Sequence, residues 1–476
     1  MLRQIRRLTT QCYDSFQVVS SEATIPELPF ASRLDPGPTQ YSSGKLHITR
    51  AKFMLILTAI RADPNGSIVG VSLLPADIFQ SICPWYRNWV INQISQQPTD
   101  TFYLIKDAAN DKSIIQNEQF LSIWSEILQS LSRVPSNSID SIVEDLISKD
   151  LLQIDSHIPS HDIPSHARYL VFAIIGWQTM LFKPDRLSYP VNRFGIIDET
   201  NGFRGRRHTQ LSQPDSEYIN PLHKLLFRFG LILPPRGLWS NLPVAPEDKA
   251  KGRATFSSES FNAHLLTAIC GINLIWTDSL ACHLEFVTAD NTLYIFRYPS
   301  FCVAHLQTEA VESSPKTTLH ACAKPVTSDD VWATIEDINR LLTEVLLSYR
   351  ILFGMEKVSR RYFRHHNPFL GVPQIMKDKM LQELCGRKRP QLSVSLSERD
   401  NFDLARDFPI LRDRLLPLLN ALSAAKPRNF GQLWSDRRDS STWFAFWVIL
   451  FIGVIGLVLA LLQVILQIVQ IALQPH

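Results

Sequence analysis

The chain has 476 residues, with 48 Lys and Arg against 45 Asp and Glu, which leaves a formal net charge of +3. Hydrophobic residues make up 45% and charged residues 20%, so the chain has enough apolar side chains for a core, and a fully disordered protein is excluded. The near balance of charge gives no reason to expect a nucleic-acid partner. The seven cysteines form no C-x-x-C pair, which is typical of a reducing compartment rather than a disulfide scaffold.

Two parts of different character are expected before the C-terminal end. Residues 1–45 predict an extended N-terminal arm, since several prolines interrupt them without any hydrophobic periodicity. Residues 46–425 predict a mainly helical body. Apolar residues recur with the helical period over 120–131 and again over 139–147, where Ser138 is a suitable N-cap. The apolar run Tyr169–Phe182 is too short to cross a bilayer, so it predicts a central core helix.

The middle of the body is less regular. Residues 184–259 are rich in Pro, Gly and charge around one apolar run, which predicts long loops around a helix and marks a division between two halves. Residues 282–298 then alternate apolar and polar side chains on both sides of Asp290-Asn291, which predicts a small β-hairpin.

Two further helices are expected near the end of the body. Ser328 precedes acidic residues and a long periodic run that stops at Gly354, so it is the predicted N-cap of one helix. Residues 404–422 predict another helix, which Pro417 bends or splits.

The strongest signal is the run from Trp443 to Leu462, which contains no charged residue. As an α-helix it would be about 30 Å long, the thickness of the hydrocarbon core of a bilayer. We therefore predict a transmembrane or interfacial helix over 443–473 and a bilayer as partner. The residues expected to anchor it are Trp443, Trp447, Phe451, Leu457 and Leu462.

The flanks of this helix predict its orientation. Lys and Arg residues occur in the juxtamembrane linker 426–442, whereas none follows the apolar run, so the body is expected to be cytosolic. The chain is thus predicted to be a single-pass, tail-anchored membrane protein. The absence of a basic tail favours the endoplasmic reticulum or a connected membrane over mitochondria.

Four glutamines share one face of the predicted helix: Gln463, Gln467, Gln470 and Gln474. One interpretation is an amphipathic end in the far headgroup region. The alternative is self-association through amide hydrogen bonds between helices, which would give a homo-oligomer.

The chain lacks the usual marks of nucleotide-binding loops, zincins and α/β-hydrolases, and no pattern points to a cofactor. Cysteines and histidines gather at 270–322, but their spacing matches no zinc module, so core packing is favoured over a metal site or a Cys–His nucleophile. The three histidines of residues 156–166 are separated by prolines, which predicts a loop rather than a metal site.

Basic residues cluster at 204–208, 357–366 and 387–389. Solvated charge is the simplest interpretation of these clusters. For a body held at a membrane, anionic headgroups are the next partner to consider, with Arg360, Arg361 and Arg364 as the contact residues.

Several stretches resemble an uncharacterised family of filamentous-fungal proteins with a C-terminal membrane anchor. They are ARYLVFAIIGWQTML (167–181), WTDSL (276–280), CHLEF (282–286), FRYPSFC (296–302), LWSDRRD (433–439) and WFAFW (443–447). The resemblance implies a helical body and a C-terminal membrane helix. It implies no activity, and only by association does it suggest an accessory role in a fungal metabolic pathway or gene cluster.

The sequence therefore suggests three alternative functions. The first is a non-catalytic protein whose body binds a protein partner or lipid. The second is a membrane-bound enzyme with an unmarked site that acts on an apolar metabolite, and the third is a self-associating membrane protein. A deep pocket with convergent ionisable groups would favour the enzyme, and a filled core would favour the binding protein.

Overall fold

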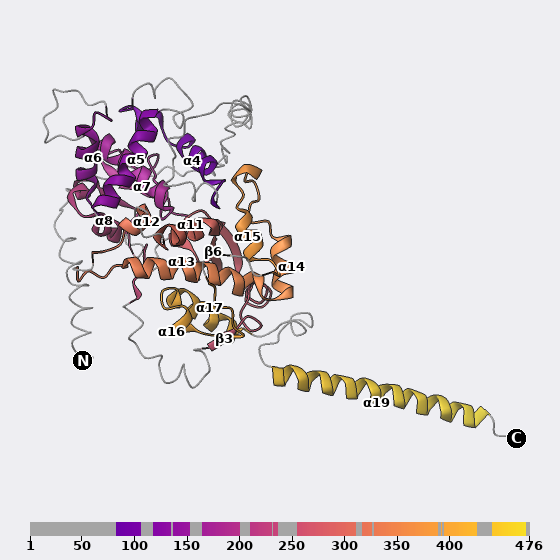
Figure 1. The fold of residues 1–476 in the computed structure, drawn as a ribbon. Coiled ribbons are helices and arrows are strands. Elements are labelled where there is room, and N and C mark those ends of the chain that lie inside the picture. The colour runs from indigo at the N-terminus through magenta and orange to yellow at the C-terminus, as the bar shows by residue number, and fades with distance from the viewer. Residues whose placement is uncertain are drawn as a thin grey trace, which may run out of the picture. The chain divides into compact units, whose positions relative to one another are not determined.

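The computed structural model describes residues 82–105, 118–134, 137–152, 164–199, 210–230, 232–236, 255–310, 317–325, 328–388, 392, 395–425 and 440–472. This part of the chain is mainly α-helical, with small sheets and one long C-terminal helix, as predicted (Figure 1). The predicted arm and residues 426–439 of the predicted linker lie outside the described residues.

The α-helices of the described body are α4 (Tyr86–Ser95), α5 (Glu118–Arg133), α6 (Ile139–Ser148), α7 (Ser165–Thr179), α8 (Leu222–Arg228), α10 (Ala263–Ala268), α11 (Pro299–Ala310), α12 (Thr318–Ala321), α13 (Ile335–Tyr349), α14 (Lys357–His365), α15 (Lys379–Leu384), α16 (Leu404–Asp407) and α17 (Arg412–Ala424). Short 3₁₀ and π segments are η1 (Thr99–Phe102), η3 (Asp215–Ile219), η5 (Leu280–Cys282), η6 (Arg350–Gly354) and η7 (Gln374–Met376). The strands are β1 (Arg193–Gly195), β2 (Ser212–Pro214), β3 (Thr255–Ser257), β4 (Asn273–Thr277), β5 (Phe286–Val287), β6 (Thr292–Phe296) and β7 (Asn401–Asp403).

Helix α7 confirms the predicted core helix. Every residue from Ala167 to Thr179 is buried, and the helix contacts α5, α6 and α12. The ring of Phe172 stacks on Phe182 at 4.6 Å and on Phe194 at 4.8 Å between centroids. A helix that is apolar on all sides is stable here because neighbours cover it completely.

Helices α5 and α6 also follow the prediction. The hydroxyl of Ser138 accepts a hydrogen bond from the Ser141 amide at 3.1 Å, as expected of an N-cap. Most of the apolar side chains that recur with the helical period in α5 and α6 are buried, and both helices contact α7, whereas Leu128 is partly buried and Ile147 is exposed.

A three-stranded sheet contains the predicted hairpin. Strands β5 and β6 are antiparallel, and Asn291 takes a positive φ of 49° in the turn. The hairpin is shorter than the predicted range, since Cys282 belongs to η5. Strand β4, which the sequence pattern does not predict, pairs in parallel with β6 and makes it the central strand of the sheet. All five residues of β6 are buried. Two-stranded antiparallel sheets join β1 to β2 and β3 to β7.

The start of helix α13 corrects one prediction. Its N-cap is Thr334, whose hydroxyl accepts from the Asp337 amide while the Asp337 side chain accepts from the Thr334 amide. Ser328 instead donates to Asp330 Oδ2 at 2.6 Å and closes a local turn. A reciprocal capping box satisfies two backbone groups, which a serine engaged in its own turn cannot do. The helical segment ends at Gly354 as predicted, the last residue of the π turn η6.

The helix expected over residues 404–422 is divided into α16 and α17. The break lies at 408–411, before Pro417, which is accommodated inside α17. The carboxylate of Glu344 on α13 accepts hydrogen bonds from the backbone N–H groups of Ile410 and Leu411. The interruption is thus stabilised by a side chain from another helix.

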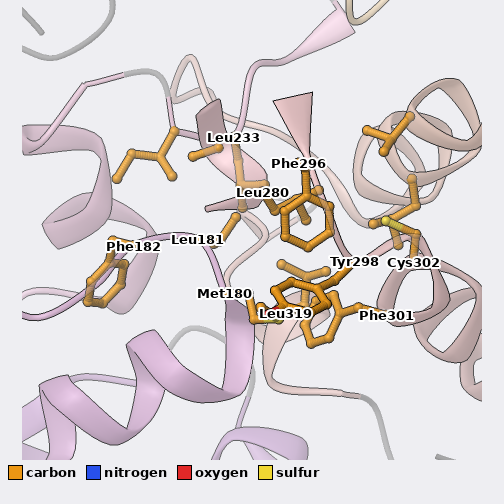
Figure 2. Close-up of a cluster of buried hydrophobic side chains, with 14 of the residues drawn as sticks. Met180, Leu181, Phe182, Leu233, Leu280, Phe296, Tyr298, Phe301, Cys302 and Leu319 are labelled. Atoms are coloured by element: carbon orange, nitrogen blue, oxygen red, sulfur yellow. The ribbon is translucent and has the colours of Figure 1, made fainter. Parts of the chain in front are cut away.

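One hydrophobic cluster extends from Cys83 to Leu422. Figure 2 shows a part of it, in which Met180 and Leu181 after α7 lie near Phe296 of β6, Phe301 of α11 and Leu319 of α12. Residues 184–259 contribute β1, β2 and α8, and their Phe194 and Phe229 pack on Phe172. Side chains on both sides of that region therefore share one core.

Candidate functional site

The C-terminal helix α19 (Ser440–Ala472) is long enough to cross a membrane. Its segment Phe444–Gln470 contains 27 residues and has a mean hydropathy of 3.0. No residue of the most apolar stretch of this segment is buried. Phe451, Leu457 and Leu462 are exposed, at 69%, 65% and 50% respectively. An apolar surface of this extent is stable only when something apolar covers it.

Two aromatic residues were predicted at the start of this helix. Trp447 is half-buried and packs against Phe446 at 5.6 Å between ring centroids, whereas the side chain of Trp443 lies outside the described part of the structure. Gln463, Gln467 and Gln470 are exposed on α19, and Gln474 is likewise not described. Their spacing of four and three residues places the three described glutamines on one helix face.

The three arginines predicted to contact lipid lie on α14, but the structure separates their roles. Arg360 is partly buried, and its Nη1 donates to the carbonyl oxygens of Gly354 at 2.7 Å and Met355 at 2.5 Å. It therefore binds the end of the preceding helical segment. Arg361 and Arg364 are exposed, so these two carry the charge that a partner can reach.

The basic surface extends beyond α14. Burial lowers the pKa of Arg360, and the positive charges of Arg364 and of Arg387, which follows α15, lower it further. Arg387 and Lys388 are exposed. We call Arg361, Arg364 and Arg387 the basic surface. The cluster at 204–208 and Arg389 lie outside the described residues.

A turn after α14 displays one large apolar side chain, which the sequence analysis did not identify. Leu370 is 84% exposed, the highest value among the large hydrophobic residues of the described chain. Its neighbour Phe369 is buried, with its ring 5.9 Å from that of Tyr298, and Gly371 has a φ of +77°. The dipeptide Leu-Gly beside Pro368 marks a turn, but only the structure shows which side chain faces water.

The cysteine and histidine cluster is part of the core. His283 Nε2 lies 2.8 Å from the hydroxyl of Ser348, and the hydroxyl of Thr317 lies between His305 Nδ1 at 2.8 Å and His320 Nδ1 at 2.7 Å. Burial raises the pKa of the thiols of Cys282, Cys302 and Cys322 and lowers the pKa of His283 and His305. Neutral, buried groups of this kind pack and hydrogen-bond. Among the described residues no group of three or more His, Cys, Asp and Glu side chains could hold a metal ion.

Charged side chains do converge at the carboxyl ends of the parallel strands β4 and β6, where α/β proteins often place their sites. Lys183 Nζ lies 2.5 Å from Glu199 Oε1 and 3.3 Å from Asp278 Oδ2. Arg297 Nε lies 2.8 Å from Asp278 Oδ1, and Trp89 Nε1 donates to Asp278 Oδ2 at 3.1 Å. These four charged residues form the charge network.

The electrostatics of the charge network favour a structural role. Burial alone would raise the pKa of Asp278, but Lys183 and Arg297 lower it below its ordinary value. Burial likewise opposes the protonation of Lys183, but Glu199 and Asp278 raise its pKa. A carboxylate and an ammonium held in these states are poorly suited to acid–base or nucleophilic catalysis near neutral pH.

A cleft of about 680 Å³ lies beside the start of α4, α11 and residues 374–383. Burial raises the pKa of Asp378 in this cleft to about 7. Its Oδ2 accepts from the Ser300 amide at 2.8 Å and its Oδ1 from the Met380 amide at 2.9 Å, so it binds the N-terminal ends of α11 and α15. The described residues that line the cleft include no histidine, and burial raises the pKa of the nearby Cys83 thiol.

No protein-family model, curated protein or solved structure is significantly similar to the chain. The resemblance to a fungal family therefore stays a prediction.

Proposed function

We propose that this chain is a single-pass membrane protein whose helical body binds anionic lipid headgroups, without catalysis, at the cytosolic surface. The observation that carries the proposal is the exposure of Arg361 and Arg364 on a body that continues into a long apolar helix. We take the endoplasmic reticulum or a connected membrane as the expected location.

The anchor supports the membrane part of the proposal. A 27-residue apolar helix is about 40 Å long, which exceeds the hydrocarbon thickness of about 30 Å and leaves room for tilt. The basic residues between the body and the helix are Lys426, Arg428, Arg437 and Arg438. Because basic residues are retained on the cytosolic side, they favour a cytosolic body.

The basic surface supports the lipid part. A basic residue close to an anionic membrane contributes about 1 kcal/mol to binding. Loss of Arg361 and Arg364 would therefore remove about 2 kcal/mol, which lowers the docking equilibrium of the body roughly thirtyfold. Arg360 is excluded from this sum because its guanidinium binds the backbone of the body.

The test uses the full-length protein in nanodiscs, with and without phosphatidylserine, and follows amide hydrogen exchange. The peptide that contains α14 should exchange more slowly in the anionic discs, and the double variant R361A/R364A should lose the difference. The matched control is R87A/R406A, which removes two exposed arginines outside the basic surface. Equal exchange of α14 in both kinds of disc would contradict the proposal.

Self-association is the second candidate function. It is favoured by the three exposed glutamines on one face of α19, because amides in lipid seek hydrogen-bond partners on neighbouring helices. The enzyme alternative receives less support: the charge network is internally paired, and Asp378 is bound by backbone amides at helix ends.

A further inference from the structure

We infer that the turn after α14 is a membrane-insertion loop, with Leu370 as the side chain that enters the acyl region of an anionic bilayer. The inference rests on the proposed function and specifies how the body meets the membrane. Its starting point is an exposed leucine that follows the exposed arginines of α14 by only a few residues of the chain.

The loop presents Leu370 in a defined way. Arg297 Nη1 donates to the carbonyl oxygen of Pro368 at 3.3 Å, which ties the loop to the end of β6. Phe369 is buried in the core, and the Val372 amide donates to its carbonyl oxygen at 3.1 Å. The positive φ of Gly371 reverses the chain directly after the leucine. The exposure of Leu370 is therefore built into an anchored turn.

A single exposed leucine is common on soluble proteins and needs no explanation by itself. What distinguishes Leu370 is its place in the chain, between the exposed basic residues Arg364 and Lys379. Arg364 precedes it by six residues, so their Cα atoms are at most about 22 Å apart. On the other side Lys379 is exposed at the start of α15. An exposed apolar residue that is flanked along the chain by exposed basic residues suits a membrane surface, in which anionic headgroups cover an apolar interior.

Charge complementarity also selects a bilayer over a second copy of the chain. A second copy would bring another basic surface against Arg361 and Arg364, and like charges in an interface are unfavourable. The membrane is present in any case, because α19 tethers the body to it under the proposed function. The loop then adds apolar contact, which salt does not screen, to a headgroup attraction that salt does screen.

The experiment labels full-length Leu370→Cys with an environment-sensitive thiol dye and reconstitutes it into vesicles with or without phosphatidylserine. The control is Leu187→Cys, since Leu187 is 78% exposed on a turn outside the basic surface. The unsubstituted chain, labelled in parallel, corrects for dye on native cysteines such as the partly exposed Cys270.

With phosphatidylserine, the dye at position 370 should shift to the blue and be quenched by lipids brominated on their acyl chains. The dye at position 187 should stay accessible to an aqueous quencher. Insertion should disappear in R361A/R364A and weaken in high salt. If the dye at position 370 stays in water while anionic lipid still slows the hydrogen exchange of α14, the inferred insertion of Leu370 is wrong and the proposed function stands. If the dye is shielded only when the protein-to-lipid ratio rises, the loop binds another protein molecule and the inference is overturned.

Discussion

The charge network at the ends of β4 and β6 gives the sharpest stability prediction. Asp278→Asn preserves the size of the side chain and an oxygen that can accept from Trp89 Nε1 at 3.1 Å. It removes the negative charge that Lys183 and Arg297 share at 3.3 Å and 2.8 Å. The four charges then no longer sum to zero, and one positive charge is left uncompensated among side chains that are at most 20% exposed.

The expected magnitude follows from that burial. Removal of one partner of a fully buried ion pair costs about 3–5 kcal/mol. Because the network keeps some contact with water, we expect Asp278→Asn to lower the free energy of unfolding by about 3 kcal/mol. Lys183→Met should also destabilise, since it leaves Asp278 and Glu199 with Arg297 alone. The double variant restores neutrality, so its loss should be smaller than the sum by about 1–3 kcal/mol.

The measurement is urea unfolding of the full-length protein in mild detergent, followed by tryptophan fluorescence, because Trp89 adjoins the network. Leu187→Ser serves as a control for a substitution at an exposed position. Single-variant effects that add within about 0.5 kcal/mol in the double variant would refute the coupling. If Asp278→Asn lowers the free energy of unfolding by less than about 1 kcal/mol, the claim that the charge network is shielded from water is refuted.

Three further outcomes are expected. Burial raises the pKa of Glu344 to about 7 from the ordinary value of 4.5, so the folded state binds this proton more tightly than the unfolded state, and the free energy of unfolding falls as the pH rises through that interval. In chemical unfolding, Glu344→Gln should remove about 3 kcal/mol of this pH dependence. An unchanged pH dependence would contradict the assignment to Glu344. Gly354→Ala would place its Cβ 2.5 Å from the carbonyl oxygen of Leu384, so it should cost about 1–3 kcal/mol, whereas Gly453→Ala, with open space around it, should leave the melting temperature of the body unchanged. Replacement of Gln463, Gln467, Gln470 and Gln474 by leucine should abolish cross-linked oligomers in detergent, and oligomers that persist would exclude this face as their cause.

The elements predicted correctly from the sequence are those whose information is local. Helix α6 carries its own cap in Ser138, and α7 is apolar on every side. The hairpin turn contains Asn291, a residue that tolerates positive φ. Periodicity, caps and turn residues act over a few positions, and so a reading of neighbouring residues recovers them.

The errors occur where distant groups compete with local ones. Ser328 and Thr334 are both suitable N-caps, and the structure selects the one that forms a reciprocal pair with Asp337. Strand β4 has a mixed pattern of exposure and is defined by its parallel pairing with β6. The break before α17 depends on a carboxylate from α13, which no local rule reveals.

For the candidate membrane surface, too, some features follow from neighbouring residues in the sequence and others only from the tertiary structure. By itself the sequence determined that the run from Trp443 to Leu462 is too apolar for water, because hydropathy sums over consecutive residues without reference to the rest of the chain. Only the tertiary structure decided that Arg360 donates hydrogen bonds to the backbone while Arg361 and Arg364 are exposed, and that Leu370 is exposed while Phe369 is buried. The exposure of a side chain is set by what folds against it, and those contacts come from parts of the chain that are far apart in sequence.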